Sequence, residues 1–188
     1  MRLKDFPLAA ATPTPSEIEA LIAECHPDVQ AVVAYWRGKA GARRMPARSD
    51  IDPSELKPFL PRISLIDVVP DSRRFVYRLV GTEEVAVRGY DPTGRSVGEG
   101  YFGPNRELAF QHYGYVVEHK APFCYRGDFE VPDGAIENED VIFLPLSEDG
   151  ETVNMILLFY YDYSDSRRVD PSSVLFRSSQ GRKSDDPT

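Results

Sequence analysis

A change of hydrophobic period near residue 60 limits the possible folds of this chain more than any other feature. Before that point, apolar side chains recur at the three- and four-residue spacing of amphipathic helices. After it, most apolar side chains alternate with polar ones, which is typical of strands that bury one face. The predicted strands span residues 63–69, 75–82, 123–131, 141–146 and 153–163. A sheet built from them has an apolar face that another part of the chain must cover.

One segment after residue 60 is long enough to provide that cover. A helix is expected from Pro104 or Asn105 to about His119, because apolar side chains there follow a helical repeat. The first two strands are joined by the turn sequence Pro70–Arg73 and form a hairpin. Asp149-Gly150 joins the last two strands, so the three C-terminal strands are expected to form an antiparallel meander.

The N-terminal part predicts two short helices or one kinked helix. Ser16-Glu17-Ile18-Glu19 has the pattern of a capping box, in which side chains bond the free N–H groups of a helix start. His26-Pro27 interrupts the helical spacing, and Gly38 ends the second segment. Asp52-Pro53-Ser54-Glu55 repeats the start signal and predicts a further short helix.

Charge and cysteine content exclude several classes of protein. The 188 residues include 30 acidic and 22 basic side chains, a net charge of −8, which argues against a nucleic acid or an anionic membrane as partner. Cys25 and Cys124 are too few for a disulfide framework and lack the spacing of metal ligands, so a reduced cytoplasmic setting and no metal are expected. No apolar stretch reaches the roughly 18 to 20 residues of a membrane span.

Enzyme motifs are absent from the sequence. There is no nucleophile elbow, phosphate-binding loop, zinc-protease motif or dinucleotide-binding motif. Two acidic pairs, Glu83 with Glu84 and Asp50 with Asp52, are interpreted as helix caps because each stands at a predicted helix start. The helix that Thr82 caps is expected to end at Gly89. The chain is therefore predicted not to be an enzyme.

Six short motifs, in this order and at this spacing, resemble those of a known family. They are Tyr35-Trp36, Met45 to Pro53, Leu60-Pro61, Arg78-Leu79-Val80-Gly81-Thr82, Gly89-Tyr90-Asp91-Pro92-Thr93-Gly94 and Leu144-Pro145-Leu146. Over about residues 30–165 the sequence resembles the PAS domain superfamily, and more closely a stand-alone bacterial PAS subfamily.

The resemblance implies an α+β fold, with a five-stranded antiparallel sheet, helices on one face that leave a small cavity, and added N-terminal helices. The expected organisation is a flexible tether (1–15), N-terminal helices (16–40), the PAS-like domain (41–165) and a polar tail (166–188). The implied function is a sensory or protein-interaction module of cytoplasmic bacterial signalling. Such a module binds a small molecule in its cavity and acts through a separate signalling protein.

Seven side chains are candidates for lining that cavity. Aromatic surfaces with a tyrosine hydroxyl suit a small ligand that has one polar group. The candidates are Tyr113, Tyr125, Phe129, Phe143, Leu158, Tyr160 and His112. The alternative is a core that the same side chains fill completely.

No cofactor is identified from the sequence. The flavin-thiol branch of the family uses a cysteine within an Asn-Cys-Arg type of motif, and neither Cys25 nor Cys124 has such neighbours. The heme-binding branches place a histidine on the long helix, where this chain has His112 and His119 on nearly the same face. The alternative for His112 is a surface imidazole.

Two sets of residues are candidates for contacts with partners. An apolar N-terminal face is predicted to pack across a two-fold axis in a homodimer. It consists of Ile18, Leu21, Ile22, Val29, Val32 and Trp36. The second set is basic and includes Arg44 and Arg48, whose spacing matches half of a phosphate clamp found in cyclic-dinucleotide receptors. The other half is absent, so an anionic contact or an acidic protein partner is expected there.

Two alternative functions remain open. A small enzyme built in the same cavity requires a base such as His112, and a strongly shifted imidazole in a closed pocket favours it. An adaptor with a filled core binds no small molecule at all.

Overall fold

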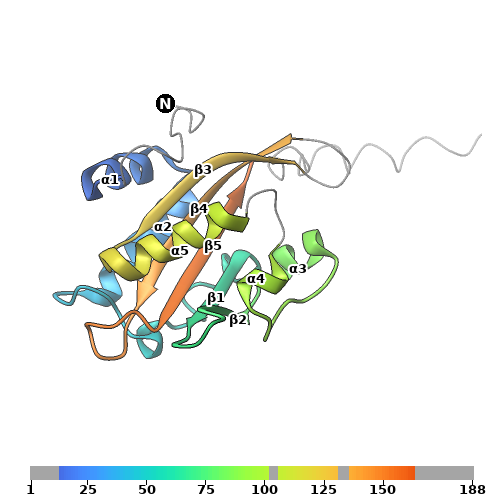
Figure 1. Cartoon of the computed structure of the whole chain (residues 1–188). Helices are drawn as coiled ribbons and strands as arrows, with labels where there is room; N and C mark the ends of the chain where they lie inside the picture. Colours follow the sequence, from blue (N-terminus) through green and yellow to red (C-terminus); the bar gives the residue numbers. More distant parts are fainter. Residues whose placement is uncertain (1–12, 102–105, 131–135, 164–188) are drawn as a thin grey trace, which may run out of the picture.

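The computed structural model describes residues 13–101, 106–130 and 136–163 (Figure 1). Its five strands form one antiparallel sheet in the order β2-β1-β5-β4-β3. The strands are β1 (Ile63–Val68), β2 (Phe75–Leu79), β3 (Phe123–Glu130), β4 (Ile136–Leu146) and β5 (Met155–Asp162). The predicted five-stranded antiparallel sheet is therefore confirmed.

β4 is longer than predicted, because it begins five residues before Val141. Its N-terminal part carries Asn138, Glu139 and Asp140, whose polarity hides a strand from a search for apolar alternation. Backbone pairing with β3 and β5 holds this part in the sheet. The sheet is therefore more polar where β4 begins than where β4 ends.

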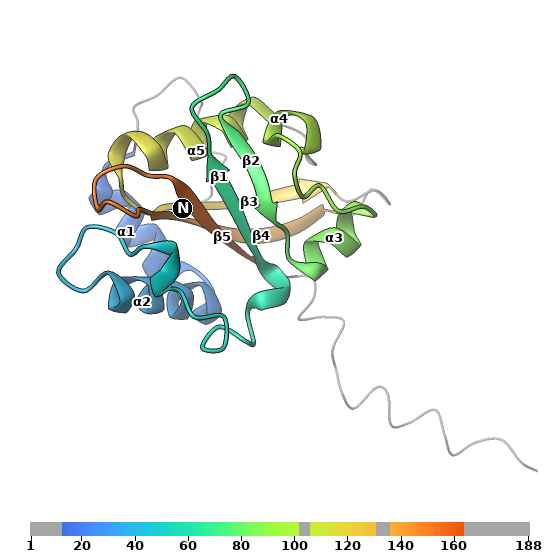
Figure 2. The ribbon, with the colours of Figure 1, turned by 90° about the horizontal axis from the view of Figure 1, so that it is seen from below.

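One face of the sheet, called the inner face below, is covered by α3 (Thr82–Arg88), α4 (Val97–Gly100) and α5 (Arg106–His119), as Figure 2 shows. The long helix lies across the strands as predicted, with Tyr113 and Val116 buried beneath it. The N-cap of α3 is Gly81, one residue before the predicted Thr82. α4 was not expected, because its sequence Val-Gly-Glu-Gly has no helical repeat.

Gly81 has a steric reason to be glycine. A Cβ atom at this position would lie 2.3 Å from the carbonyl oxygen of Pro61 and 2.9 Å from that of Ile63. The backbone before α3 can therefore pass directly against η3 (Leu60–Arg62) and the start of β1. This close approach sets the position of α3 on the inner face.

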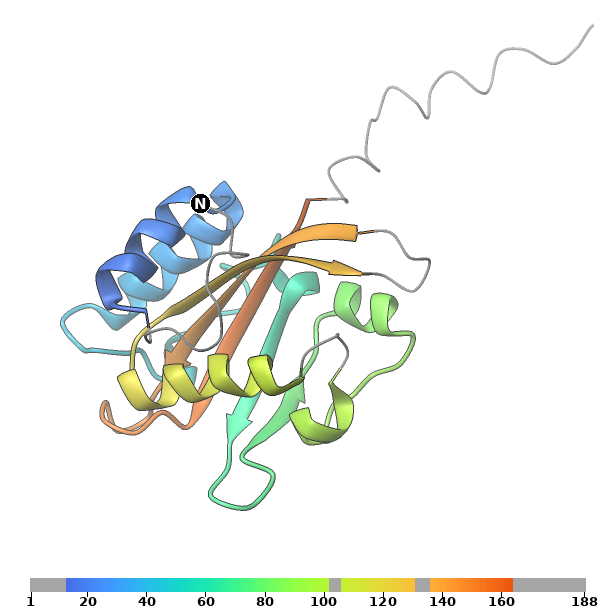
Figure 3. The ribbon, with the colours of Figure 1, turned by 45° about the horizontal axis from the view of Figure 1, so that its top comes forward.

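The opposite, outer face is covered by α1 (Pro15–Glu24) and α2 (Pro27–Ala40), which run side by side in Figure 3. The indole N–H of Trp36 donates a hydrogen bond of 2.8 Å to the carbonyl oxygen of Pro145 in β4. The predicted dimer face is wrong, because five of its six side chains are buried against the chain's own sheet. Those five are Ile18, Ile22, Val29, Val32 and Trp36, while Leu21 is half-buried at the edge.

The predicted start of the first helix is wrong by two residues. Thr14, not Ser16, caps α1: its side chain accepts a hydrogen bond of 3.3 Å from the Glu17 N–H, and the Glu17 carboxylate accepts one of 2.7 Å from the Thr14 N–H. Thr14-x-x-Glu17 has the same capping-box pattern, and Pro15 suits the first helical position.

The helix predicted at Asp52 does not form. Residues 53–59 make successive turns, with bonds such as Leu56 N–H to Pro53 C=O, followed by the short 3-10 helix η3. Pro58 has no backbone N–H to donate the next helical hydrogen bond, so the segment does not continue as an α-helix. A second short 3-10 helix, η2 (Arg48–Asp50), precedes it.

Several predictions fall on residues that are not described. They concern most of the N-terminal tether, the tail 166–188 and the side chain of Phe129, whose backbone alone is placed in β3. Within the described parts of the chain, none of the helices is both apolar enough and long enough for a membrane crossing.

Candidate functional site

The inner face forms an aromatic wall beneath α5. His112 stacks on Phe123 with ring centroids 4.7 Å apart and lies 5.1 Å from the Tyr125 ring. Tyr113 contacts Phe143 edge to face at 5.2 Å. Phe123, Tyr125 and Phe143 alternate along β3 and β4 with residues of the outer face, so their rings point to the same side of the sheet, towards α5.

A buried ion pair lies where this wall meets α3. The Arg88 guanidinium contacts the Glu84 carboxylate one helical turn earlier, and the two side chains are only 7% and 17% exposed. The second Glu84 oxygen accepts a hydrogen bond of 2.5 Å from the Ser64 hydroxyl in β1. Arg88 also donates to the Gly100 carbonyl at 2.6 Å and to the Tyr77 hydroxyl at 3.3 Å. The pair thus connects α3 with β1, β2 and the end of α4.

Sequence reasoning assigned Glu84 to helix capping and missed this pair. Glu84 lies in the first turn of α3, but its carboxylate is bonded to Ser64 and Arg88 rather than to backbone N–H groups. The available signal was the four-residue spacing from Glu84 to Arg88, which favours an ion pair on one side of a helix. Its burial was not foreseeable without the position of α3.

Burial and nearby charge shift the titration of several groups in this region. Burial raises the pKa of Tyr77 to about 12, against the opposing effect of Arg88. It also raises the pKa of Tyr113 and of Tyr160 well above their usual range, with Glu84 adding to both shifts. The hydroxyl groups therefore remain protonated and can donate hydrogen bonds.

Glu139 has the most altered carboxyl group of the inner face. Burial raises the pKa of this side chain to about 8, and the negative charges of Glu84, Asp162 and Asp140 add to the increase. The neutral form is therefore favoured near pH 7. A second negative charge is disfavoured at this end of the inner face, whereas a neutral or cationic group is not.

The six described side chains predicted to line a cavity all lie on the inner face. His112, Tyr113, Phe143 and Leu158 are buried, and Tyr125 and Tyr160 are half-buried. The polar groups that accompany them were not among the predicted site residues. They are Ser64, Tyr77, Glu84, Arg88 and Glu139.

His112 has a shifted pKa but does not have the surroundings of a catalytic base. Burial alone lowers its pKa to about 4, so the imidazole is neutral at physiological pH. Rings of Phe123, Tyr125 and Phe143 surround it. A pKa of about 4 also lies well below the operating range of a general base near neutrality. The strong pKa shift that the enzyme hypothesis requires is therefore present, but aromatic rings pack against the imidazole and the cavity described below does not include it.

A cavity of about 300 Å³ lies on the other side of the sheet. Its lining is mostly apolar and includes Leu60 and Leu79, which are 37% and 46% exposed. β1, β5 and the turns after Pro53 form its walls, and Arg48 lies at its margin. This cavity was not predicted, because residues 53–59 were expected to be helical.

The five basic residues between positions 37 and 48, in the last turn of α2 and after it, each have a partner within the chain, which reduces the local positive charge expected there. Arg44 donates to the carbonyl oxygens of His119 and Lys120 at the end of α5, at 2.7 and 3.2 Å. Arg48 donates to the Ile51 carbonyl at 3.0 Å. The other three are paired with acidic side chains: Arg37 with Glu19, Lys39 with Glu55, and Arg43 with Asp50.

Comparison with known proteins identifies a family. The sequence matches the PAS domain family over residues 24–160. No curated protein matches the chain. Among solved structures, a light-oxygen-voltage domain is 14% identical, with a TM-score of 0.45 over 64% of this chain and 93% of that one.

Two further structures are similar. The PAS domain of BvgS from Bordetella pertussis is 14% identical, with a TM-score of 0.45 over 57% of this chain and 83% of that one. The PAS domain of an HTR-like protein from Haloarcula marismortui is 23% identical, with a TM-score of 0.39 over 58% of this chain and 89% of that one.

Proposed function

The chain belongs to the PAS domain family, and we propose that it is a cytoplasmic sensory module that binds a small molecule on its inner face and acts through a separate signalling protein. The ligand has an apolar body, which fits the aromatic wall, and a neutral or cationic polar group, which fits the end near Glu84 and Glu139. PAS domains are in general sensory signalling modules rather than enzymes.

The observation that carries this proposal is the buried Glu84–Arg88 pair. Removing two charges from water is costly, and a pair of apolar side chains often stabilises a core as well or better. A buried pair with polar neighbours is instead suited to exchange hydrogen bonds with a ligand, because its donors and acceptors are already oriented. Tyr77 and Ser64 supply those neighbours.

The same pair offers a way to transmit binding. Arg88 holds the end of α4 through the Gly100 carbonyl, and Glu84 holds β1 through Ser64. A ligand that takes over one of these hydrogen bonds favours a second packing of α3 against the sheet. Its effect on the partner is limited to its difference in affinity for the two packings.

Native mass spectrometry of the protein purified from its own host tests the proposal. We expect a retained small molecule that is released on unfolding. The double variant E84M/R88M, which keeps the volume but removes the charges, should lose that mass, whereas E83Q should retain it because Glu83 pairs with Arg62 instead. Wild-type protein with no retained mass would contradict ligand binding.

A second function, an adaptor without a small ligand, is favoured by the outer cavity. Its apolar lining and the exposed Leu60 and Leu79 are suited to an apolar side chain of a partner protein. This hypothesis predicts that L79D abolishes binding of the signalling partner while E84M/R88M does not. The opposite pattern supports the sensory hypothesis.

A further inference from the structure

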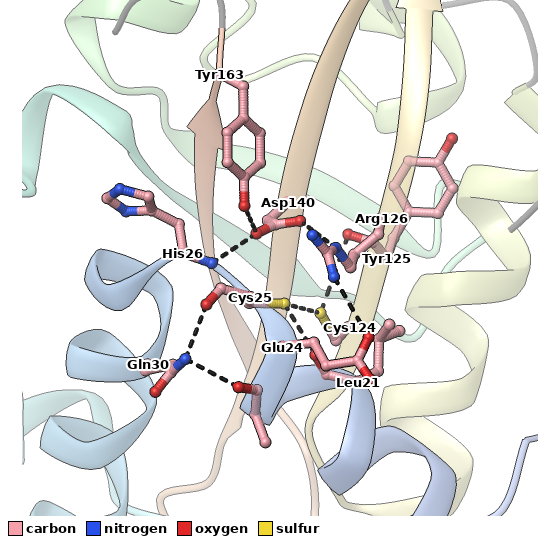
Figure 4. A network of polar contacts seen from close by, with 11 residues as sticks. Leu21, Glu24, Cys25, His26, Gln30, Cys124, Tyr125, Arg126, Asp140 and Tyr163 are labelled. Carbon is pink, nitrogen blue, oxygen red and sulfur yellow. Dashed lines mark hydrogen bonds and ion pairs between the residues drawn. The ribbon is translucent and has the colours of Figure 1, made fainter. Parts of the chain in front are cut away.

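The two cysteines meet on the outer face, although they stand 99 positions apart in the sequence. Their Sγ atoms are 3.1 Å apart, and the residues are 3% and 2% exposed (Figure 4). This contact was not predicted from the sequence. Both cysteines are free thiols, and the described residues add no third metal ligand to them.

Neighbouring contacts hold both sulfur atoms in place. Cys25 ends α1, where its thiol contacts the Leu21 carbonyl at 3.3 Å and its own carbonyl accepts a hydrogen bond of 2.8 Å from Gln30 in α2. Cys124 belongs to β3 and is paired with Ile142 of β4. The two thiols therefore link the α1–α2 joint to the sheet.

A buried carboxylate reinforces this joint. Asp140 is fully buried and accepts hydrogen bonds from the His26 N–H and the Tyr163 hydroxyl, both at 2.7 Å, and from Arg126 at 2.8 Å. These contacts lie beside the thiols, as Figure 4 shows. The relative position of Cys25 and Cys124 is consequently set by the fold before any bond forms between them.

We propose that Cys25 and Cys124 are a redox modification site, at which a hydroperoxide converts the two thiols into a reversible disulfide. The sulfur of Cys25 attacks one peroxide oxygen, the O–O bond breaks, and the other oxygen takes up the proton of the Cys25 thiol and leaves as water or an alcohol. Cys124 then attacks the resulting sulfenic acid, the S–O bond breaks, and its proton leaves with the hydroxyl as water. The peroxide gains the two electrons that the thiols lose.

Geometry favours the disulfide over further oxidation. The sulfur atoms need to approach by about 1 Å to reach bonding distance. Cys25 is the residue expected to react first. It caps the C-terminal end of the ten-residue helix α1 and becomes exposed when α1 leaves the sheet, whereas Cys124 is held within the sheet. The hydrogen bond with Cys25 and burial raise the pKa of Cys124, so the pair resists oxidation while α1 is in place.

The consequence is that oxidation fixes α1 to the sheet. In the reduced protein α1 is held by few buried side chains, chiefly Ile18 and Ile22, and by the partly exposed ion pair of Glu24 with Arg126. A disulfide between Cys25 and β3 removes the freedom of α1 to leave. This control acts on the outer face and does not depend on the ligand of the inner face.

Intact-mass measurement of the full chain tests the site. Reduced protein is treated with hydrogen peroxide, unfolded and weighed. We expect a loss of about 2 Da, no thiol left to label, a monomer on a non-reducing gel and full reversal by dithiothreitol. The oxidised protein should melt about 10 °C higher, because the bond closes a loop of about 100 residues.

The variants C25S and C124S are the matched controls, since each keeps the shape of the pair but leaves one thiol. Neither should lose 2 Da. A wild-type mass that is unchanged, that rises only in steps of about 16 Da, or that doubles through an intermolecular bond would overturn the proposal.

Discussion

The two faces of the sheet are stabilised in different ways. On the inner face, the ion pair joins Glu84 and Arg88, which are four residues apart within α3. On the outer face, Cys25 meets Cys124 and His26 meets Asp140, residues about one hundred positions apart. The inner charges are therefore assembled within one helix, whereas the outer network exists only when the N-terminal helices lie on the sheet. A ligand on the inner face is therefore expected to act on the contacts of α3, whereas a separate set of contacts on the outer face holds the N-terminal helices.

The largest expected effect is on the inner face. E84A leaves the Arg88 guanidinium buried without its carboxylate, and we expect a loss of about 4 kcal/mol in the free energy of unfolding. Urea denaturation of the full chain measures it. E83A is the control, because the Glu83–Arg62 pair is partly exposed and should contribute less than about 1 kcal/mol. Equal losses in the two variants would show that the inner face does not depend on its buried charge.

The inner face was largely predictable from the sequence because its signals are local. Alternating aromatic side chains on β3 and β4 identified the buried side, and the repeat in residues 105–119 identified the covering helix. The buried Glu84–Arg88 pair was not predicted, because a glutamate at a helix start has a simpler explanation as a helix cap. Only the close approach at Gly81 places its carboxylate against Ser64.

The second prediction concerns the outer face. D140A removes the acceptor of three hydrogen bonds, and we expect a loss of about 3 kcal/mol. The loss is smaller than for E84A because Arg126 is about one-third exposed and regains water. Y163F, which removes only one of the three donors, should cost about 1 kcal/mol. A D140A effect no larger than that of Y163F would show that the network does not hold the joint.

The outer face was predicted poorly because its contacts are between distant segments. The alternation in β3 made Cys124 and Arg126 look solvent-exposed, and the apolar side of the N-terminal helices looked free for a second copy. Both errors have one cause: α1 and α2 cover that side of the sheet. No pattern within either segment shows which surface it will meet.

The third prediction returns to the inner face and concerns pH. His112 has a pKa lowered by burial from 6.5 to about 4, so the unfolded chain takes up a proton before the folded one. The contribution of His112 to stability is therefore complete above pH 6.5 and falls as the pH approaches 4, by about 2 kcal/mol between pH 8 and pH 5. Glu139, whose pKa is raised to about 8, changes stability in the opposite direction over the same range, because the folded protein keeps a proton that the unfolded chain releases. Urea midpoints are therefore compared between wild type and H112Q, and their difference should follow the His112 slope.

H112Q should lack this contribution, whatever its own stability at pH 8. H119Q is the matched control on the same helix, and because it leaves His112 in place the slope should persist. If H112Q shows the wild-type slope, the loss of stability in acid arises from other groups and the inner face is not its source.

The smallest expected effect tests the end of the outer face. T14A removes the side-chain oxygen that accepts a hydrogen bond from the Glu17 N–H at the start of α1, and we expect a loss of about 1 kcal/mol. S16A, at the position first predicted as the cap, should change stability by less than about 0.5 kcal/mol. Because α1 ends at Cys25, a frayed α1 should also speed the peroxide reaction of the thiols in T14A but not in S16A. Equal oxidation rates in the two variants would mean that the thiols become accessible by a route other than the opening of α1.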